Sequence, residues 1–383
     1  MLRIFNIIFI SIFLLILFIP LFFLDLENDR VSVQENRMLA KYPLLSDIRS
    51  NPITFIHDFE SWLKDSTGFR EFSLFLYNFV EKNKKLSGFW YKDGQYIILI
   101  GDHGHHYFAD YNGFLISKFQ GKQFLTNHQL ESLAYKLEEI RKYLDTKCIP
   151  LVVMLRADKE TVYPEFYPKS IKKGPEPVQL DIITDYIKTN TNVNIFNIKQ
   201  ALLKEKNNYL LYHLVDTSDF TKDYAHYNEI GAFFAYRELM NYINIYYPEL
   251  IPYEFSDLSI NYDEKSIPEV SLKVENTYKK LDPSDIDEFL ISLDVPWAQE
   301  IYQNQNQNLP VALILRDSYA SEAYIGKYIA QHFGKVIMVH YNSIEHFEYF
   351  VGLYKPDIVI LESAERSLIN FADKIVKIPK LSF

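Results

Sequence analysis

The sequence has little cysteine, little glycine and no excess of basic residues. One cysteine, Cys148, occurs in 383 residues, so neither an intrachain disulfide nor a cysteine-based metal cluster can form. We expect Cys148, just before a predicted strand, to be a small buried hydrophobic residue. With 12 glycines and no glycine-rich loop, the common nucleotide-binding motifs are absent. The formal net charge is −10 and no basic patch is present, which argues against a nucleic-acid partner.

What the chain has in quantity is apolar and aromatic side chains. Hydrophobic residues make up 48% and charged residues 23% of the sequence, which predicts a packed globular core rather than disorder. Aromatic residues reach 16%. This excess could serve sugar stacking, but it is more typical of ordinary core and surface packing.

The first apolar run is residues 4–24, "IFNIIFISIFLLILFIPLFFL", which carries no charge. It is long enough to cross a bilayer, and no small-residue cleavage site follows it. Arg3 before it and acidic residues after it favour an orientation with the remainder outside the cytoplasm. We therefore expect a transmembrane anchor at 1–24, a linker at 25–52 and an extracytoplasmic domain, periplasmic or at the cell surface, at 53–383.

Beyond the linker, helical and strand patterns alternate. Apolar residues at three- and four-residue spacing predict helices, and continuous apolar runs predict strands that are buried on both faces. The alternation predicts an α/β, doubly wound, mostly parallel sheet with flanking helices. The polar stretch 252–309 does not follow this alternation of helices and strands and is interpreted as an insertion. The predicted helices are 129–146, 177–189, 229–247 and 321–333, and the predicted strands are 149–155, 193–196, 310–317, 335–339 and 357–362.

Ser318 follows one of these strands directly, in "ILRDSYASEAY". Ligands of an open parallel sheet bind beyond the carboxyl ends of its strands, and a serine nucleophile needs a base and a group that orients the base. His226 lies just before a helix that Asn228 is expected to cap, and Asp223 is three residues earlier. Spacing alone leaves two interpretations open: a catalytic triad, or a serine that caps a helix and a histidine that makes a surface hydrogen bond.

Several blocks of the sequence, taken in order, resemble one family. They run from about 36 to 368, and they resemble the alginate O-acetyltransferase family of AlgJ and AlgX, whose catalytic domains are SGNH-hydrolase-like. The blocks are "NRMLAKYP" (36–43), "FESWLKDSTGFRE" (59–71), "IGDHGHHYFAD" (100–110), "GKQFLTNHQLE" (121–131), "RADKETVYPEFYP" (156–168), "HYNEIGAFFAY" (226–236), "LRDSYASEAY" (315–324) and "KPDIVILESAERSL" (355–368).

Carried over residue by residue, the resemblance implies that Ser318 is the nucleophile and His226 the base. The family usually shows Asp-x-His, but Tyr224 stands at that position here. Asp223 gives the Asp-x-x-His of SGNH hydrolases at large, and we predict it as the third member, with Asp219 as the alternative.

Other residues near Ser318 are expected to support the site. The backbone N–H of Ser318 or Tyr319, at the predicted helix start, is a natural donor to an oxyanion, aided by the helix dipole. Four charged residues are expected to buttress the site through ion pairs rather than to touch substrate: Arg316, Asp317, Glu365 and Arg366.

The resemblance implies an enzyme that acetylates hydroxyls of an exported or cell-surface polysaccharide through an acetyl-serine. It also implies a partner, a membrane-bound O-acyltransferase that supplies the acetyl group. Two alternatives stay open. The protein is a carbohydrate acetylesterase if water replaces the sugar, or a non-catalytic polysaccharide-binding or assembly subunit if the displaced aspartate reflects lost activity.

A histidine triplet invites a metal interpretation. Adjacent histidines on a strand point to opposite faces, so at most His103 and His105, and not His106, could share an ion. No carboxylate at ligand spacing accompanies them. The stretch 96–115 reads instead as strand, turn, strand, with Gly101 and Gly104 in the turn. We expect neither a metal nor a cofactor.

Overall fold

The computed structural model describes residues 31–32, 37–46, 48, 51–66, 90–93, 96–109, 114–122, 124–214, 226–262, 268–281 and 299–382. The chain divides into two compact units, residues 1–94 and 95–383. The expected boundaries of a linker at 25–52 and one domain from residue 53 remain a prediction.

The first unit contains a helix and short strands. Strands β1 (Val31–Ser32) and β2 (Arg37–Met38) pair antiparallel, and β3 spans Trp90–Asp93. Helix α3 (Pro52–Ser66) buries Trp62, against which Tyr42 packs edge-on at 4.8 Å between ring centroids. The helix end is tied to the preceding segment because the Ala40 N–H donates to the Asp65 carboxylate at 2.8 Å.

The predicted transmembrane helix at residues 4–24 lies outside the described residues. Among the residues that are described, no helix is long and apolar enough to cross a bilayer. This finding corrects the fold prediction, which included such a helix, and it overturns the single-pass membrane location that rested on it. The α/β part of the prediction agrees with the structure.

The second unit is built on a seven-stranded sheet in the order β10-β11-β13-β12-β14-β6-β7. Neighbours from β13 to β7 pair in parallel, whereas β11 pairs antiparallel with both β13 and β10. The sheet is therefore mixed. Its strands are β6 (Leu151–Arg156), β7 (Asn194–Asn197), β10 (Tyr278–Lys280), β11 (Glu300–Asn304), β12 (Val311–Arg316), β13 (Lys335–His340) and β14 (Ile358–Ala364).

The antiparallel edge comes from the stretch that polarity marked as an insertion. Strand β11 reads EIYQN, but it is largely buried, and its polar groups find partners. Glu300 accepts from Arg316 and Lys280, and the Asn304 amide donates to the Ala330 and Gln331 carbonyls at 3.2 Å. Because satisfied polar groups can be buried, a strand of low hydrophobicity was missed.

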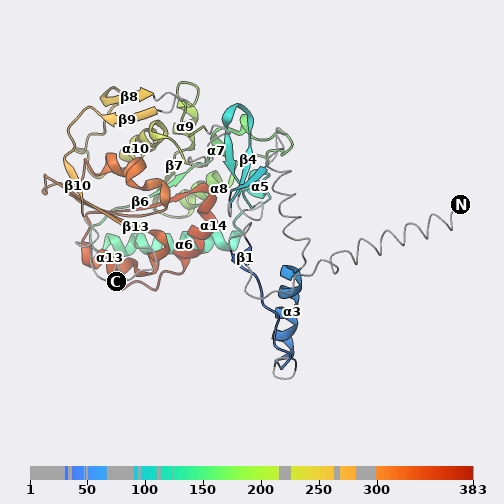
Figure 1. The fold of residues 1–383 in the computed structure, drawn as a ribbon. Helices are drawn as coiled ribbons and strands as arrows, with labels where there is room; N and C mark the ends of the chain where they lie inside the picture. The colour runs from blue at the N-terminus through green and yellow to red at the C-terminus, as the bar shows by residue number, and fades with distance from the viewer. Residues whose placement is uncertain are drawn as a thin grey trace. The chain divides into compact units, whose positions relative to one another are not determined.

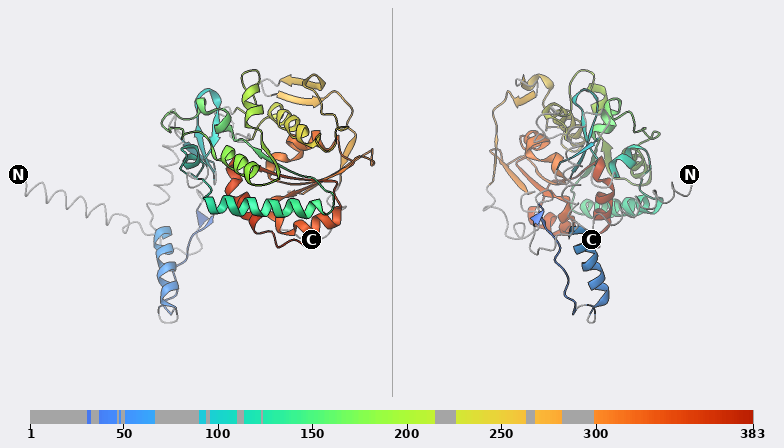
Figure 2. Two further views of the ribbon diagram at one scale, coloured as in Figure 1. Left: turned by 180° about the vertical axis from the view of Figure 1, so that it is seen from behind. Right: turned by 45° about the vertical axis from the view of Figure 1, so that its right-hand side comes forward.

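Helices cover both faces of this sheet, as Figures 1 and 2 show. Helices α6, α8 and α14 pack together on one face, and α10 lies on the other with α9 and α12. Strands β6 and β14 are therefore buried along their whole length, which is why they read as continuous apolar runs. The helices are α5 (Phe114–Phe119), α6 (Asn127–Asp145), α7 (Lys159–Val162), α8 (Gln179–Asn190), α9 (Lys199–Glu205), α10 (Glu229–Ile243), α12 (Lys327–Ile329), α13 (Phe347–Tyr354) and α14 (Leu368–Val376).

Helix α6 shows how the sequence sets its ends. Thr126 and Gln129 form a reciprocal capping box at its start, and the predicted apolar stripe from Leu130 to Leu144 is buried. The turn to β6 places Cys148 at φ +58°, where it is exposed. The expectation of a buried cysteine is wrong, because the residue belongs to the left-handed turn after the helix and not to the strand.

The predicted helix 321–333 is confirmed only in part, because it is shorter than expected and does not begin as a regular α-helix. After β12 the chain makes a 3₁₀ turn, Ser318–Ala320, then a π-helical turn, Glu322–Gly326, before α12. The Ser321 carbonyl accepts from Tyr324 at 3.0 Å and from Gly326 at 3.1 Å, a five-residue spacing typical of a π turn. A Cβ on Gly326 would meet the Ser321 oxygen at 2.9 Å, so glycine permits this close approach.

Two hairpins complete the part of this unit that the structure describes. Strands β4 (Tyr96–Ile100) and β5 (His106–Phe108) pair antiparallel, as predicted, across a turn in which His103 and Gly104 have positive φ. Strands β8 (Leu258–Tyr262) and β9 (Pro268–Leu272) form the second hairpin.

Candidate active site

Three neighbouring parallel strands end at one edge of the sheet. Strand β12 lies beside β14, and β14 lies beside β6. Parallel pairing brings their carboxyl ends together. At this edge the chain presents Arg156 from β6, Ser318 just after β12, and Glu362 from β14.

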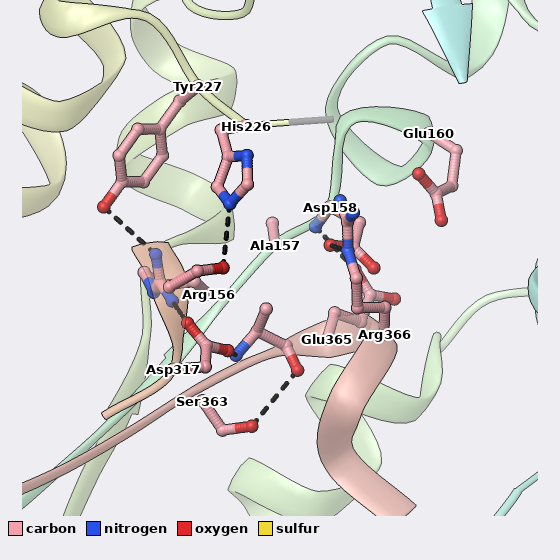
Figure 3. Close-up of polar contacts among 12 residues, drawn as sticks. Arg156, Ala157, Asp158, Glu160, His226, Tyr227, Asp317, Ser363, Glu365 and Arg366 are labelled. Carbon is pink, nitrogen blue, oxygen red and sulfur yellow. Dashed lines mark hydrogen bonds and ion pairs between the residues drawn. The ribbon is translucent and has the colours of Figure 1, made fainter. Parts of the chain in front are cut away.

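The structure brings Ser318 and His226 together. His226 Nε2 lies 2.9 Å from Ser318 Oγ, and Figure 3 shows this contact as the dashed line from the His226 ring. In the tautomer protonated at Nδ1, Nε2 accepts the serine O–H. Ser318 is exposed and His226 is half-buried, so the pair can be reached from solvent while the ring is held in place.

Asn228 fixes the loop that carries His226. As predicted, it caps α10: its Oδ1 accepts from the Ile230 and Gly231 N–H groups at 3.1 and 3.0 Å. Its own side-chain amide donates to the Leu210 carbonyl at 2.7 Å. A cap two residues away therefore limits where the imidazole can lie.

An aromatic ring supports the imidazole from the side. The rings of His226 and Tyr324 are stacked, with centroids 5.1 Å apart and planes inclined by 12°. Tyr324 is the residue at which the π-helical turn is kinked. The irregular backbone after β12 thus places the ring against His226.

The predicted third member of the triad lies outside the described residues. Asp223, its alternative Asp219, and Tyr224 all fall within 215–225. The assignment of the orienting carboxylate stays a prediction.

A buried arginine connects the neighbours of both candidate residues. Arg156 is fully buried and makes ion pairs with Asp317 and Glu362. Its Nη1 also donates to the Tyr227 hydroxyl at 3.1 Å. Tyr227 follows His226 and Asp317 precedes Ser318, so one guanidinium holds both sides of the pair, as Figure 3 shows.

Backbone donors complete this network. The Ala364 N–H donates to Asp317 at 2.7 Å, and the Asp317 N–H donates to Glu362 at 3.1 Å. Burial lowers the pKa of Arg156, but the two carboxylates outweigh burial and raise it above its usual range. Burial raises the pKa of Glu362 above its usual range, while Arg156 opposes the shift and Asp317 adds to it. The guanidinium is therefore permanently charged.

A second buried charge cluster surrounds Asp158, two residues beyond Arg156. Arg366 Nε donates to Asp158 Oδ1 and Lys118 Nζ to Asp158 Oδ2, each at 2.9 Å. The Asp158 N–H donates to Glu365 at 3.0 Å. Burial raises the pKa of Glu160 to about 7, and the charge of Asp158 acts in the same direction. These contacts join the ends of β6 and β14 with α5.

The remaining predicted site residues lie as follows. Arg316 donates to Glu300 of β11 at 2.8 Å and to the Asp317 carbonyl at 2.9 Å. Tyr319 belongs to the 3₁₀ turn. That turn does not begin a regular α-helix, so the expected contribution of a helix dipole to an oxyanion site is wrong.

Sequence reasoning missed Arg156, Tyr227, Glu362 and Tyr324. A signal for two of them was present, since Arg156 and Glu362 are charged residues at the ends of otherwise apolar strands, a position that ion pairing explains. Tyr324 had no such signal, because a regular helix was expected there.

The histidine triplet spans the turn, its last residue and the first residue of β5. His103 lies in the turn, whereas His105 and His106 are buried. The His105 ring stacks on Phe166 with centroids 4.4 Å apart. His106 Nδ1 lies 3.2 Å from the Gly104 carbonyl. Burial lowers the pKa of His105 to about 3, and the charge of Lys159 contributes.

Comparisons with known proteins give structural similarity only. No family model and no curated protein matches the chain. Bacillus cereus PatB1 with a sulfonyl adduct has TM-score 0.47 and 16% identity, over 66% of this chain and 93% of that chain. A DHHW family protein from Eubacterium siraeum has TM-score 0.46 and 12% identity, over 76% of this chain and 98% of that chain. The O-acetyltransferase domain of Pseudomonas putida AlgJ has TM-score 0.39 and 15% identity, over 73% of this chain and 98% of that chain. These structures include the family that the sequence resembles but do not single it out, and at such values they assign no function.

Proposed function

We propose that the protein is an O-acetyltransferase that moves acetyl groups onto carbohydrate hydroxyls through an acetyl-serine intermediate. The observation that carries the proposal is the 2.9 Å contact between His226 Nε2 and Ser318 Oγ. It lies at the carboxyl edge of a parallel sheet, where ligands bind, and it has the length that a catalytic hydrogen bond requires.

In the first half-reaction, Ser318 Oγ attacks the carbonyl carbon of an acetyl ester as His226 Nε2 takes the hydroxyl proton. The bond from that carbon to the donor oxygen then breaks, and the imidazolium protonates the leaving oxygen. In the second half, His226 takes a proton from a sugar hydroxyl, which attacks the acetyl-serine. Ser318 Oγ leaves and recovers the proton, so the enzyme is regenerated and acetyl has changed oxygens.

Other groups have proposed roles. Asp223 would orient the imidazole, and the backbone N–H of Ser318 or Tyr319 would donate to the oxyanion. One such donor typically lowers the barrier by about 3–4 kcal/mol. From the family resemblance we also propose that a partner acyltransferase supplies the acetyl group.

A second candidate, carbohydrate acetylesterase, is favoured by the exposure of Ser318. Water that reaches the acetyl-serine would release free acetate. The contact with His226 weighs against the third possibility, a non-catalytic subunit, because such a subunit does not require a hydroxyl and an imidazole at hydrogen-bond distance.

The test is Ser318→Ala, with Ser321→Ala, which directly follows the 3₁₀ turn of Ser318, as the matched control. The proteins are incubated with p-nitrophenyl acetate, with and without an oligosaccharide acceptor, and separately with a sulfonyl fluoride followed by peptide mapping. We expect Ser318→Ala to lose acetyl turnover and labelling, and Ser321→Ala to keep both. Full turnover in Ser318→Ala would remove the nucleophile assignment. Acetylated oligosaccharide supports the transferase, whereas acetate alone supports the esterase.

A further inference from the structure

A groove opens beside the candidate base. Its volume is about 430 Å³, within the range of ligand pockets in proteins. Its walls include Tyr324, His213 and Glu229, together with Asn261, Glu269 and Ser271 of the β8–β9 hairpin. We name it the Tyr324 groove.

The groove adjoins the catalytic pair through one side chain. Tyr324 lines the groove and also stacks on the His226 ring. Tyr324 is therefore shared by the groove and the surroundings of the imidazole. This position suits the acceptor, because the acceptor hydroxyl must reach His226 after the acetyl-serine has formed.

The hairpin wall is anchored. Glu229, the first residue of α10, accepts from the Val270 N–H and from Lys327 Nζ at 2.7 Å. Lys327 Nζ also donates to the Val270 carbonyl at 3.2 Å. The central residue of β9 is thus fixed to α10 through its N–H and to α12 through its carbonyl, so the groove has a preformed wall.

The charges of the walls indicate which acceptor fits. None of the described residues that line the groove is lysine or arginine, and two are carboxylates. Lys327 neutralises Glu229, which leaves the exposed Glu269. A carboxylate repels an anionic ligand nearby, whereas asparagine, serine and carboxylate oxygens can hydrogen-bond sugar hydroxyls.

We propose that the Tyr324 groove binds the acceptor and that this acceptor is a neutral oligosaccharide rather than a polyuronate. The acceptor role rests on the proposed function; the preference for a neutral glycan rests on the groove itself. It follows that an uncharged sugar chain occupies the groove with one hydroxyl directed toward His226.

Binding tests this without requiring catalysis. The affinities of cellohexaose and of hexagalacturonate are measured by calorimetry at low salt. We expect cellohexaose to bind at least tenfold more tightly. The discrimination should shrink in 1 M salt, because screening removes the repulsion of the uronate. Equal or tighter binding of hexagalacturonate, or binding of neither sugar, overturns the inference.

Two variants test whether the oligosaccharide binds in the Tyr324 groove. Ser271→Trp fills it and should weaken cellohexaose binding at least tenfold. Glu269→Lys reverses the wall charge and should shift the preference at least tenfold toward hexagalacturonate. The matched controls are Glu275→Trp and Glu275→Lys, since Glu275 is exposed beyond β9, and both should bind like the wild type.

Wild-type affinity in Ser271→Trp would overturn the groove assignment, provided that thermal unfolding shows a folded protein. The proposed function fails separately. If the wild type binds cellohexaose but a sulfonyl fluoride does not label Ser318, the groove stands as a glycan site and the acetyl-serine mechanism falls.

Discussion

Two histidines in this molecule have the same kind of aromatic support and different surroundings. The His226 ring stacks on Tyr324, with planes inclined by 12°, and the His105 ring stacks on Phe166, with planes inclined by 19°. His226 faces the hydroxyl of Ser318 at 2.9 Å. His105 is 3% exposed, and Tyr163 packs against it at 4.9 Å between centroids.

The difference teaches that aromatic stacking does not decide what a histidine does. His105 is buried among rings, and its pKa is lowered to about 3, so at neutral pH it serves as an uncharged packing group. His226 lies at the sheet edge, where Arg156 fixes the residues next to it and next to Ser318. The polar contacts of Arg156 with the residues next to His226 and Ser318, rather than ring contacts, distinguish His226 as the candidate base.

Replacing each histidine tests the comparison most directly. His226→Gln removes the proton acceptor of Ser318 while keeping a polar side chain. General-base catalysis typically contributes about 10²–10⁴-fold, so acetyl turnover should fall by about that factor. His105→Phe keeps the ring stack and should keep most of the turnover per folded molecule. Both are measured as initial rates with p-nitrophenyl acetate, normalised to the folded fraction.

The comparison breaks if the two variants lose activity equally, because His105 would then matter to chemistry as much as His226. It is sharpened if sulfonyl fluoride labelling of Ser318 slows only in His226→Gln, since labelling reports the nucleophile apart from acceptor binding.

Arg156→Met tests the framework on the His226 side. It leaves Asp317 and Glu362 buried without their cation, and breaking a buried pair in this way typically costs about 3–5 kcal/mol. We expect the free energy of unfolding to fall by about that amount in urea titrations, with reduced turnover in the folded fraction.

The matched control is Arg237→Met, since Arg237 pairs with exposed Glu254 at 3.0 Å. Surface pairs contribute only about 0–1 kcal/mol, so little change is expected. Similar losses of unfolding free energy in the two variants would mean that burial of Arg156 adds nothing to stability. The buried network would then not explain the geometry of the site.

Much of this framework could be predicted. Strands 149–155 and 357–362 were predicted because helices cover both faces of the sheet, and such strands read as continuous apolar runs. The rule that sites lie at carboxyl ends placed Ser318 at the sheet edge, but its pairing with His226, 92 residues away, was implied only by the family resemblance. The cap at Asn228 followed from its side chain.

The rest depends on contacts that the sequence does not display. Arg156 pairs with a residue 206 positions away, and nothing in the local pattern says which charges will meet. The π turn at Tyr324 is set by a hydrogen bond to Ser321 that competes with regular helix. Strand β11 was hidden because its polar residues are satisfied only by distant partners.

The smallest expected effect concerns the pH dependence of stability on the His105 side. Unfolded, His105 binds a proton near its ordinary pKa of 6.5, whereas in the folded protein the pKa is about 3. Between these values the unfolded state binds more protons, so acidification favours unfolding. His105→Phe removes this proton uptake. Its stability relative to the wild type should therefore rise as the pH falls, by at most about 1.4 kcal/mol per pH unit below 6.5.

Urea titrations at pH 7 and pH 5 measure this relative change, which should approach about 2 kcal/mol. His128→Phe is the matched control, because His128 is exposed on α6 and its variant should follow the wild type at both pH values. If the His105→Phe and wild-type stabilities stay parallel from pH 7 to pH 5, His105 takes up its proton in the folded state as readily as in the unfolded one. The two histidines would then differ in position but not in the cost of charging them, and burial among rings would no longer explain why His105 is a packing group.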